Sequence, residues 1–137
     1  TGVTEIINYN VVDDVGTVMN PLLLGGQIQG GIAQGIGQAL LEKIIYDNDG
    51  QLITGSFMDY AMPRAEDMSF MEVKANPVPT KTNPLGVKGA GEAGNVGGLA
   101  AVMNAVINAL KPIGVDHVDM PLSPERLWKT IQSQQGG

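Results

Sequence analysis

The sequence predicts an α+β fold built from mixed strands, two long helices and a short C-terminal helix. Three observations support this prediction. Between residues 25 and 44, isoleucine or leucine recurs at every fourth position, which marks one face of a helix. Residues 95–110 are mostly apolar and predict a second, buried helix. Short runs rich in valine, isoleucine, tyrosine or methionine predict strands at 3–12, 51–60 and 68–75.

The composition limits both the architecture and the partners. The chain has 137 residues, 43% of them hydrophobic, so residues 1–137 are expected to form one unit, with a frayed tail at 132–137. The net charge of −6, with only eight Lys and Arg, argues against a nucleic-acid partner. The absence of cysteine and the single histidine, His117, exclude iron–sulfur ligation and predict no metal ligands on this chain. No apolar run of about 18 residues is present and no signal peptide is visible, so we expect no membrane span and a cytoplasmic location.

The first half of the chain alternates turns with regular segments. Asp13-Asp14-Val15-Gly16 has turn chemistry, although its adjacent carboxylates leave a metal pair as the alternative. Asn20-Pro21 then interrupts the chain before the first long helix. The apolar face of this helix is expected to consist of Ile28, Ile32, Ile36, Leu40 and Ile44. Its glycines at 30, 31, 35 and 37 each cost roughly 1 kcal/mol relative to alanine, so they should permit close backbone packing or leave room for a ligand.

The second half follows the same logic. Asp47-Asn48-Asp49-Gly50 predicts a hairpin turn, and the three prolines within 76–84 predict an extended connection. Lys111-Pro112 should end the second helix, and 115–118 predicts a short strand. The last helix should begin at Ser123-Pro124-Glu125, with Ser as the N-cap. Its apolar face is expected to carry Leu127, Trp128 and Ile131.

The stretch from Asn83 to Gly98 is the strongest candidate for a ligand-binding loop. It holds six glycines in sixteen residues, and its one acid is Glu92. Glycine lets the backbone approach a bound group closely, so many glycines around one carboxylate suggest a loop shaped to a ligand. Glu92 should sit just before a helix N-terminus, where the helix dipole favours an ionised carboxylate, whereas burial would favour the neutral form.

The spacing Gly89-x-Gly91-x-x-Gly94 also matches the dinucleotide-binding fingerprint, with Asp116 and Asp119 about where a ribose-binding acid would lie. That fingerprint needs a buried strand directly before its first glycine, and 83–88 is a poor strand. An acid inside the glycine turn would also repel a pyrophosphate. A dinucleotide-binding module using the GAGEAG loop therefore stays an alternative that the residues disfavour.

Longer motifs carry a resemblance over nearly the whole chain. These are GGQIQGGIAQGIGQAL after Asn20-Pro21, GSFMDYAMPRA at 55–65, PTKTNPLGVKGAGEAG at 79–94 and PLSPERLW at 121–128. In order and without large gaps, they resemble the C-terminal part of the molybdopterin-binding large subunit of the molybdenum hydroxylases. That family includes xanthine dehydrogenase, aldehyde oxidase and aerobic carbon monoxide dehydrogenase. NPLGVKGAGEAG looks more like the carbon monoxide dehydrogenase-like branch than the purine branch.

The resemblance implies roles for three residues. Glu92 matches the active-site glutamate of the family, which acts as the general base, and a carboxylate suits that role. Gly91 matches a glycine beside the cofactor, where the missing side chain allows close approach. Gln27 matches a glutamine that hydrogen-bonds the cofactor, and a primary amide offers donors and an acceptor without charge. Gln34, Gln38 and Lys88 receive no role and remain candidates for supporting the site or for packing.

The resemblance also implies a cofactor and partners. The cofactor would be molybdopterin with its molybdenum, in some members as the cytosine dinucleotide, and the substrate a small molecule hydroxylated at an electron-poor carbon. Iron–sulfur clusters and FAD would lie on partner subunits, and the remainder of the large subunit would complete the pocket. The isolated chain is expected to be inactive. A non-catalytic fragment that serves only in assembly is the second alternative.

Overall fold

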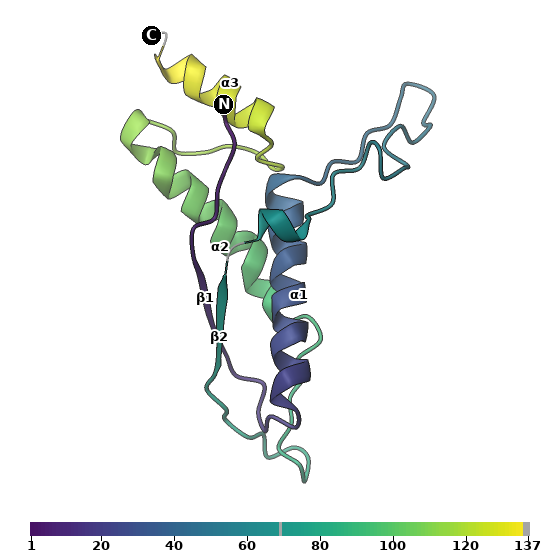
Figure 1. The fold of residues 1–137 in the computed structure, drawn as a ribbon, viewed down its shortest axis with the longest axis vertical. Coiled ribbons are helices and arrows are strands. Elements are labelled where there is room, and N and C mark those ends of the chain that lie inside the picture. The colour runs from purple at the N-terminus through teal and green to yellow at the C-terminus, as the bar shows by residue number, and fades with distance from the viewer. Residues whose placement is uncertain (69, 136–137) are drawn as a thin grey trace.

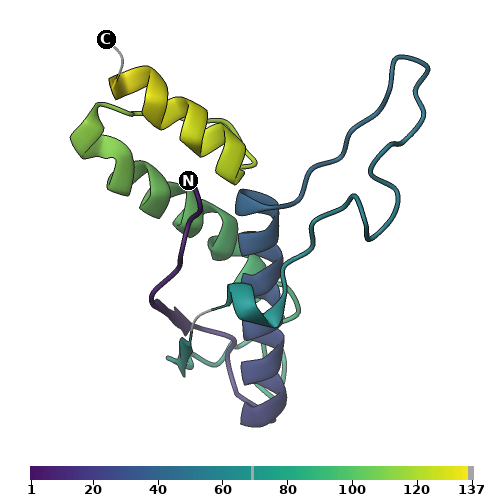
Figure 2. The ribbon, with the colours of Figure 1, turned by 45° about the horizontal axis from the view of Figure 1, so that its top comes forward.

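A computed structural model describes residues 1–68 and 70–135 as a pair of crossed helices beside a small sheet (Figure 1). This arrangement confirms the predicted α+β class. Both described ends of the chain lie at the same end of the molecule, and an arm made by residues 42–63 projects away from the helices (Figures 1 and 2). In chain order the elements are β1 (Tyr9–Asp13), α1 (Pro21–Leu40), η1 (Ala65–Asp67), β2 (Met71–Ala75), α2 (Ala93–Leu110), η2 (Lys111–Ile113) and α3 (Pro124–Gln135).

Helix α1 begins where the sequence interrupts the chain. Asn20 is the N-cap, and its side-chain oxygen accepts a hydrogen bond from the Leu23 N–H at 3.1 Å. Proline in the first turn has no N–H that would need a partner. The predicted apolar face is confirmed from Ile28 to Leu40, but Ile44 lies beyond the end of α1 and is 61% exposed. At the end of the helix the N–H groups of residues 41 and 42 both donate to the Gly37 carbonyl, so the regular i→i−4 pattern stops there.

Helix α2 crosses α1 at backbone contact. A Cβ built on Gly35 would come within 2.7 Å of the Leu99 nitrogen, and one on Gly31 within 2.9 Å of the Asn95 nitrogen. One on Gly94 would overlap the backbone of α1. Close packing, one of the two uses expected of the helical glycines, is therefore the use at this crossing.

The expectation that α2 is buried holds for only part of its surface. Gly94, Gly98, Val102 and Val106 are buried, whereas Val96 is 82% exposed. The segment Ala93–Ile113 has a mean hydropathy of 1.4 and is long and apolar enough to cross a membrane by length and composition alone. From the sequence we expected no segment of this kind. A core helix of a soluble protein meets the same criterion of length and composition. This segment therefore does not by itself assign the chain to a membrane.

The sheet is smaller than predicted. Strands β1 and β2 pair in parallel, with Tyr9 opposite Met71 and Asp13 opposite Ala75. Residues 3–8 are unpaired, and of the strand predicted at 68–75 only 71–75 forms, with Ser69 outside the described residues. The strand predicted at 51–60 is wrong: the hairpin turn forms, but Leu52 makes only an isolated bridge with Tyr46. The predicted strand at 115–118 is also wrong, because its two valines are buried as part of an irregular segment.

The C-terminal segment closes the core at the far end of α1. The Leu122 N–H donates to the Ala39 carbonyl at 2.7 Å, and Leu122 is fully buried. Helix α3 starts at Pro124 as predicted and continues through Gln135. Residues 136–137 lie outside the described chain. Leu127 is buried, but Trp128 is 48% exposed and does not belong to the core.

Candidate functional site

Glu92 occupies the N-cap position of α2, as the sequence predicted. Its carbonyl oxygen accepts hydrogen bonds from the N–H groups of Asn95 at 3.0 Å and Val96 at 3.1 Å, which start the helix. The side chain is exposed, and within the described residues its carboxylate makes no capping bond. The first turn of α2 contains no other acid. The Glu92 carboxylate is therefore exposed at the start of α2 and available to meet a bound group.

Gln27 meets the glycine loop from the other helix. It lies in the second turn of α1, and its side-chain Nε2 donates to the Gly91 carbonyl oxygen at 2.7 Å. These two residues are 64 positions apart in the chain. The structure thus brings Gln27, Gly91 and Glu92 together at the N-terminal ends of both long helices. The backbone contact between α1 and α2, which begins at Gly94, makes this meeting possible.

The glycines around this meeting point face open space. A Cβ built on them would find no atom within 4 Å, in contrast to the glycines of the helix crossing. They lie on the first half of α1, in the loop before α2 and in the first turns of α2. The set consists of Gly25, Gly26, Gly30, Gly89, Gly91 and Gly97. Bare backbone on both sides of the Gln27–Gly91 hydrogen bond leaves room for a bound group, which is the second use expected of the helical glycines.

A second set of contacts anchors the chain just before the loop. The Asp14 carboxylate accepts hydrogen bonds from the N–H groups of Gly16 and Val78, both at 2.9 Å, and from Lys88 Nζ at 2.5 Å. The ammonium of Lys88, followed by the two backbone N–H groups, lowers the pKa of Asp14 to about 2. Asp14 is therefore more than a solvated turn residue, because its carboxylate links the turn to Val78 and Lys88. Across the described residues, no group of three or more His, Cys, Asp or Glu side chains could hold a metal ion.

Residues 1–69 match the model of the molybdopterin cofactor-binding domain family. The chain belongs to this family. It is 40% identical over 132 residues to the nicotine 6-hydroxylase large subunit of Paenarthrobacter nicotinovorans, and 34% identical over 132 residues to the carbon monoxide dehydrogenase large chain of Hydrogenophaga pseudoflava. Each alignment covers 96% of this chain and 16% of the relative, so the chain spans about a sixth of their length.

Solved structures of the family have the same fold. The Cu,Mo-containing carbon monoxide dehydrogenase matches with a TM-score of 0.93 at 34% identity, over 98% of this chain and 17% of that one. Quinoline 2-oxidoreductase from Pseudomonas putida 86 matches with a TM-score of 0.90 at 42% identity, over 95% of this chain and 16% of that one. The resemblance inferred from the glycine-rich motifs is thereby confirmed. By their names, these relatives are hydroxylases, dehydrogenases and oxidoreductases.

The site of this molybdopterin cofactor-binding domain fits a large polar cofactor. It offers an amide side chain, one carboxylate and bare glycine backbone. Within the described chain, the nearby Lys88 is already paired with Asp14. These are groups that hydrogen-bond and closely approach a cofactor without adding a second charge to the site.

The dinucleotide alternative lacks its structural context. Directly before Gly89, the described residues form only an isolated bridge between Val87 and Gly16, not a buried strand. Asp116 and Asp119 lie in an irregular segment after α2 rather than at a strand end. The third glycine of the motif, Gly94, serves the helix crossing.

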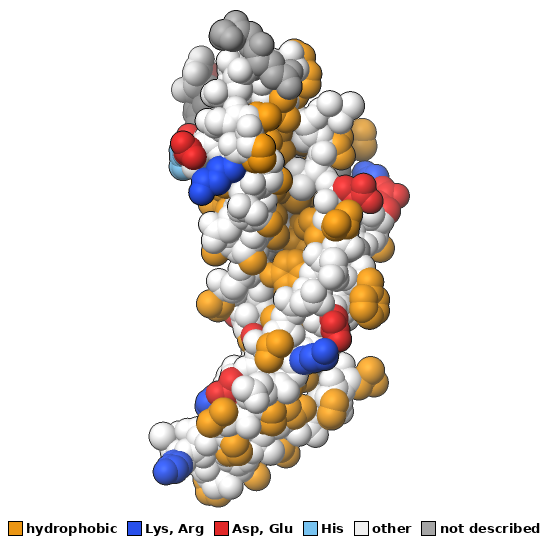
Figure 3. Space-filling view, turned by 90° about the vertical axis from the view of Figure 1, so that its left-hand side faces the viewer, with side chains coloured by type: hydrophobic (Ala, Val, Ile, Leu, Met, Phe, Trp, Pro, Cys, Tyr) orange, Lys and Arg blue, Asp and Glu red, His pale blue; other side chains and the backbone are white. Residues whose placement is uncertain are grey.

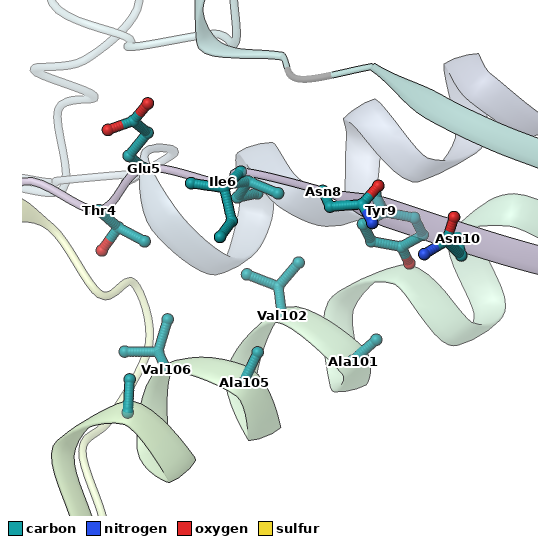
Figure 4. Close-up of a pocket in the computed structure, with 12 residues that line it drawn as sticks. Thr4, Glu5, Ile6, Asn8, Tyr9, Asn10, Ala101, Val102, Ala105 and Val106 are labelled. Carbon is teal, nitrogen blue, oxygen red and sulfur yellow. The ribbon is translucent and has the colours of Figure 1, made fainter.

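A groove of about 400 Å³ lies elsewhere, between the extended N-terminal segment and α2. Val102 and Val106 point from α2 toward this segment (Figure 4), and apolar side chains gather along the middle of the face in Figure 3. Burial, followed by the Asp13 carboxylate, raises the pKa of Tyr9 in its wall. Gln27, Gly91 and Glu92 do not line this groove, so it is separate from the candidate site.

Asp14 is the residue that sequence reasoning missed. Its bonding partners Val78 and Lys88 are 64 and 74 positions away. No local pattern in the sequence signals a contact over such separations. Only the turn formed by residues 13–16 was visible, and that turn is present with Gly16 at φ +66°.

Proposed function

We propose that the chain supplies the general base and part of the cofactor pocket of a molybdenum-dependent oxidoreductase. The reaction would hydroxylate an electron-poor carbon of a small molecule with oxygen taken from water. The observation that carries this proposal is the hydrogen bond from Gln27 Nε2 to the Gly91 carbonyl, which holds the loop beside Glu92. The cofactor, when bound, would supply the redox chemistry that none of these side chains can perform.

Each of the three residues has a distinct task in this proposal. Glu92 accepts a proton at its carboxylate, which lies at the N-terminus of α2 and makes no capping bond within the described residues. Gln27 uses one N–H on the Gly91 carbonyl and keeps its other N–H and its side-chain oxygen for the cofactor. Gly91 leaves open space where a side chain would stand, so that the cofactor can approach the backbone.

An aromatic nitrogen heterocycle is the substrate class that we propose to test first. The relatives at 40% and 42% identity are named for nicotine and quinoline, whereas an aldehyde oxidoreductase from Desulfovibrio gigas is 28% identical. Carbon next to a ring nitrogen is electron-poor, which fits attack by a nucleophile that a base has deprotonated. An aldehyde and carbon monoxide complete the set of substrates to be assayed.

The proposal includes partners, because three residues cannot hold a cofactor alone. We expect the remainder of a large subunit to complete the pocket, and iron–sulfur and FAD subunits to carry the electrons away. A cytoplasmic location and the cytosine dinucleotide form of molybdopterin belong to the same proposal. A relative named as subunit gamma of a 6-hydroxypseudooxynicotine dehydrogenase complex, at 38% identity, supports an assembly of several subunits. By itself, the chain should neither retain the cofactor nor turn over.

The test compares Glu92→Gln with wild type in the assembled enzyme purified from its source. Molybdenum is measured by elemental mass spectrometry, and turnover of nicotine, quinoline, an aldehyde and carbon monoxide is followed with an electron-accepting dye. Loss of a general base should lower the rate by roughly 10² to 10⁴-fold while molybdenum content stays unchanged. Glu72→Gln, an exposed acid on β2, is the control and should behave as wild type.

Two further results bear on the proposal. Gln27→Leu should lower molybdenum content, whereas Gln29→Leu, an exposed neighbour on α1, should not. Full activity of Glu92→Gln would contradict the assignment of the base. An intact wild-type assembly without molybdenum would instead favour the non-catalytic alternative.

A further inference from the structure

The segment that leads to Glu92 is tied to the turn between β1 and α1. This segment consists of residues 78–88. The Asp14 carboxylate accepts a hydrogen bond from the Val78 N–H at its start and another from Lys88 Nζ at its end. We call Asp14, Gly16, Val78 and Lys88 the Asp14 clamp. One carboxylate therefore contacts the turn itself and two points ten residues apart on the segment that precedes the site.

Backbone hydrogen bonds fix the same segment in register. The Lys88 N–H donates to the Val15 carbonyl and the Thr17 N–H to the Gly86 carbonyl, both at 3.0 Å. Gly16 admits no side chain here, because a Cβ on it would overlap the Gly86 carbonyl oxygen and its φ is +66°. The clamp thus fixes the chain up to Lys88.

Only a short glycine-rich piece separates the clamp from the candidate base. Residues 89–91, Gly-Ala-Gly, connect Lys88 to Glu92, and glycine backbone is conformationally free unless it is held. On the other side, the Gln27 side chain holds Gly91 by its carbonyl. On the loop side, Glu92 is therefore held by an anchor at each end of this piece, and Lys88 supplies the first of them.

We propose that Asp14 is a positioning residue that acts through Lys88 to hold the 89–91 loop, so that Glu92 is presented to the reacting group. This inference rests on the proposed role of Glu92 as the base. The low pKa of Asp14 agrees with it, because the carboxylate stays ionised toward Lys88 over the working pH range. Lys88 accordingly has a structural partner and is not free to bind substrate.

Three variants of the holoenzyme separate the parts of the clamp. Asp14→Asn keeps a carbonyl oxygen for the N–H groups of Gly16 and Val78 but loses the charge that faces Lys88. Lys88→Met removes the same link from the other side, and Lys88→Arg restores a cation. Glu125→Gln breaks an exposed ion pair with Lys129 on α3 and is the matched control.

The measurements are hydrogen exchange of the peptide covering 86–93, molybdenum content, and kcat and KM for the best substrate. Asp14→Asn and Lys88→Met should each speed exchange in this peptide about five- to tenfold and lower kcat about tenfold. KM and molybdenum content should stay near wild type. The double variant should be no worse than either single one, since both remove one link. Lys88→Arg should restore most of kcat.

Exchange and kcat equal to those of Glu125→Gln would overturn the proposal. So would faster exchange throughout the chain with loss of molybdenum, because the pair would then serve the whole fold rather than the loop. The proposed function fails separately: if Glu92→Gln keeps full activity while Asp14→Asn still loosens the 86–93 peptide, the clamp exists but the base is misassigned.

Discussion

The glycine contacts between α1 and α2 give a prediction whose size follows from the geometry. Gly35→Ala places a Cβ 2.7 Å from the Leu99 nitrogen and 2.9 Å from the Gly98 carbonyl carbon. Both are backbone atoms of α2 and cannot rotate away. The helices must therefore separate by several tenths of an ångström at this crossing. Gly30→Ala, five residues earlier on α1, places its Cβ in open space and is the matched control.

Gly35→Ala and Gly30→Ala share a gain in helix propensity, but only Gly35→Ala forces a methyl group against α2. Alanine is better than glycine inside a helix by roughly 1 kcal/mol, and this gain applies to both positions. Forcing a methyl group into a well-packed contact costs about 1–3 kcal/mol, and this applies to Gly35 alone. The shared gain cancels in the comparison. Gly35→Ala should therefore be less stable than Gly30→Ala by about 1–3 kcal/mol.

Hydrogen exchange of α1 and α2 peptides in the purified protein measures this difference. An exchange rate changes tenfold for each 1.4 kcal/mol in opening free energy, so Gly35→Ala should exchange about 5- to 150-fold faster than Gly30→Ala. Gly98→Ala should fall between them, since its Cβ would make an ordinary contact at 3.5 Å with the Ile32 Cα. Equal protection in Gly35→Ala and Gly30→Ala would refute the view that the crossing requires glycine.

Two further predictions concern single hydrogen-bonding groups. Asn20→Ala removes the cap of α1 and should destabilise its first turn by about 1 kcal/mol, seen as faster exchange of the Leu23 amide, whereas Asn48→Ala in the hairpin turn should not change it. The pKa of Asp14 falls from 3.8 to about 2 on folding, so the stability it contributes is fully present above pH 4 and lost as pH falls through 2. The urea midpoints of wild type and Asp14→Asn should therefore differ at pH 7 and converge near pH 2; a gap that persists there would contradict the ion-pair argument.

The helices could be predicted from the sequence because their signals are local. Apolar residues recur at every fourth position from Ile28 to Leu40, and Asn20-Pro21 marks the N-terminus of the same helix. Both signals come from α1 and its cap alone. The strands were less predictable, because pairing depends on a partner far along the chain. The run at 51–60 has strand-like residues, but it lies in the projecting arm and finds only the single bridge between Leu52 and Tyr46.

At the candidate site too, features with local signals could be predicted from the sequence, whereas contacts between distant residues could not. Glu92 at a helix start and the glycine-rich loop were visible in the sequence, and the resemblance to a family added Gln27 and Gly91. Their convergence needs the crossing of α1 and α2, which periodicity alone does not predict. Asp14 could not be found at all, because its carboxylate acts on Val78 and Lys88, and the intervening chain gives no sign of that contact.

The helix crossing has a consequence for how this domain can change over evolution or in engineering. Gly94 follows Glu92 by two residues, and the carbonyl that it packs against belongs to Ile28, next to Gln27. The backbone contact between Gly94 and Ile28 thus holds the two helices together and also sets the distance between the Gln27 amide and the Glu92 carboxylate. Substitutions at this crossing will therefore alter both the stability of the fold and the placement of these two side chains. Selection for a new substrate should therefore act mainly on the open glycine positions and the surrounding surfaces, leaving the crossing untouched.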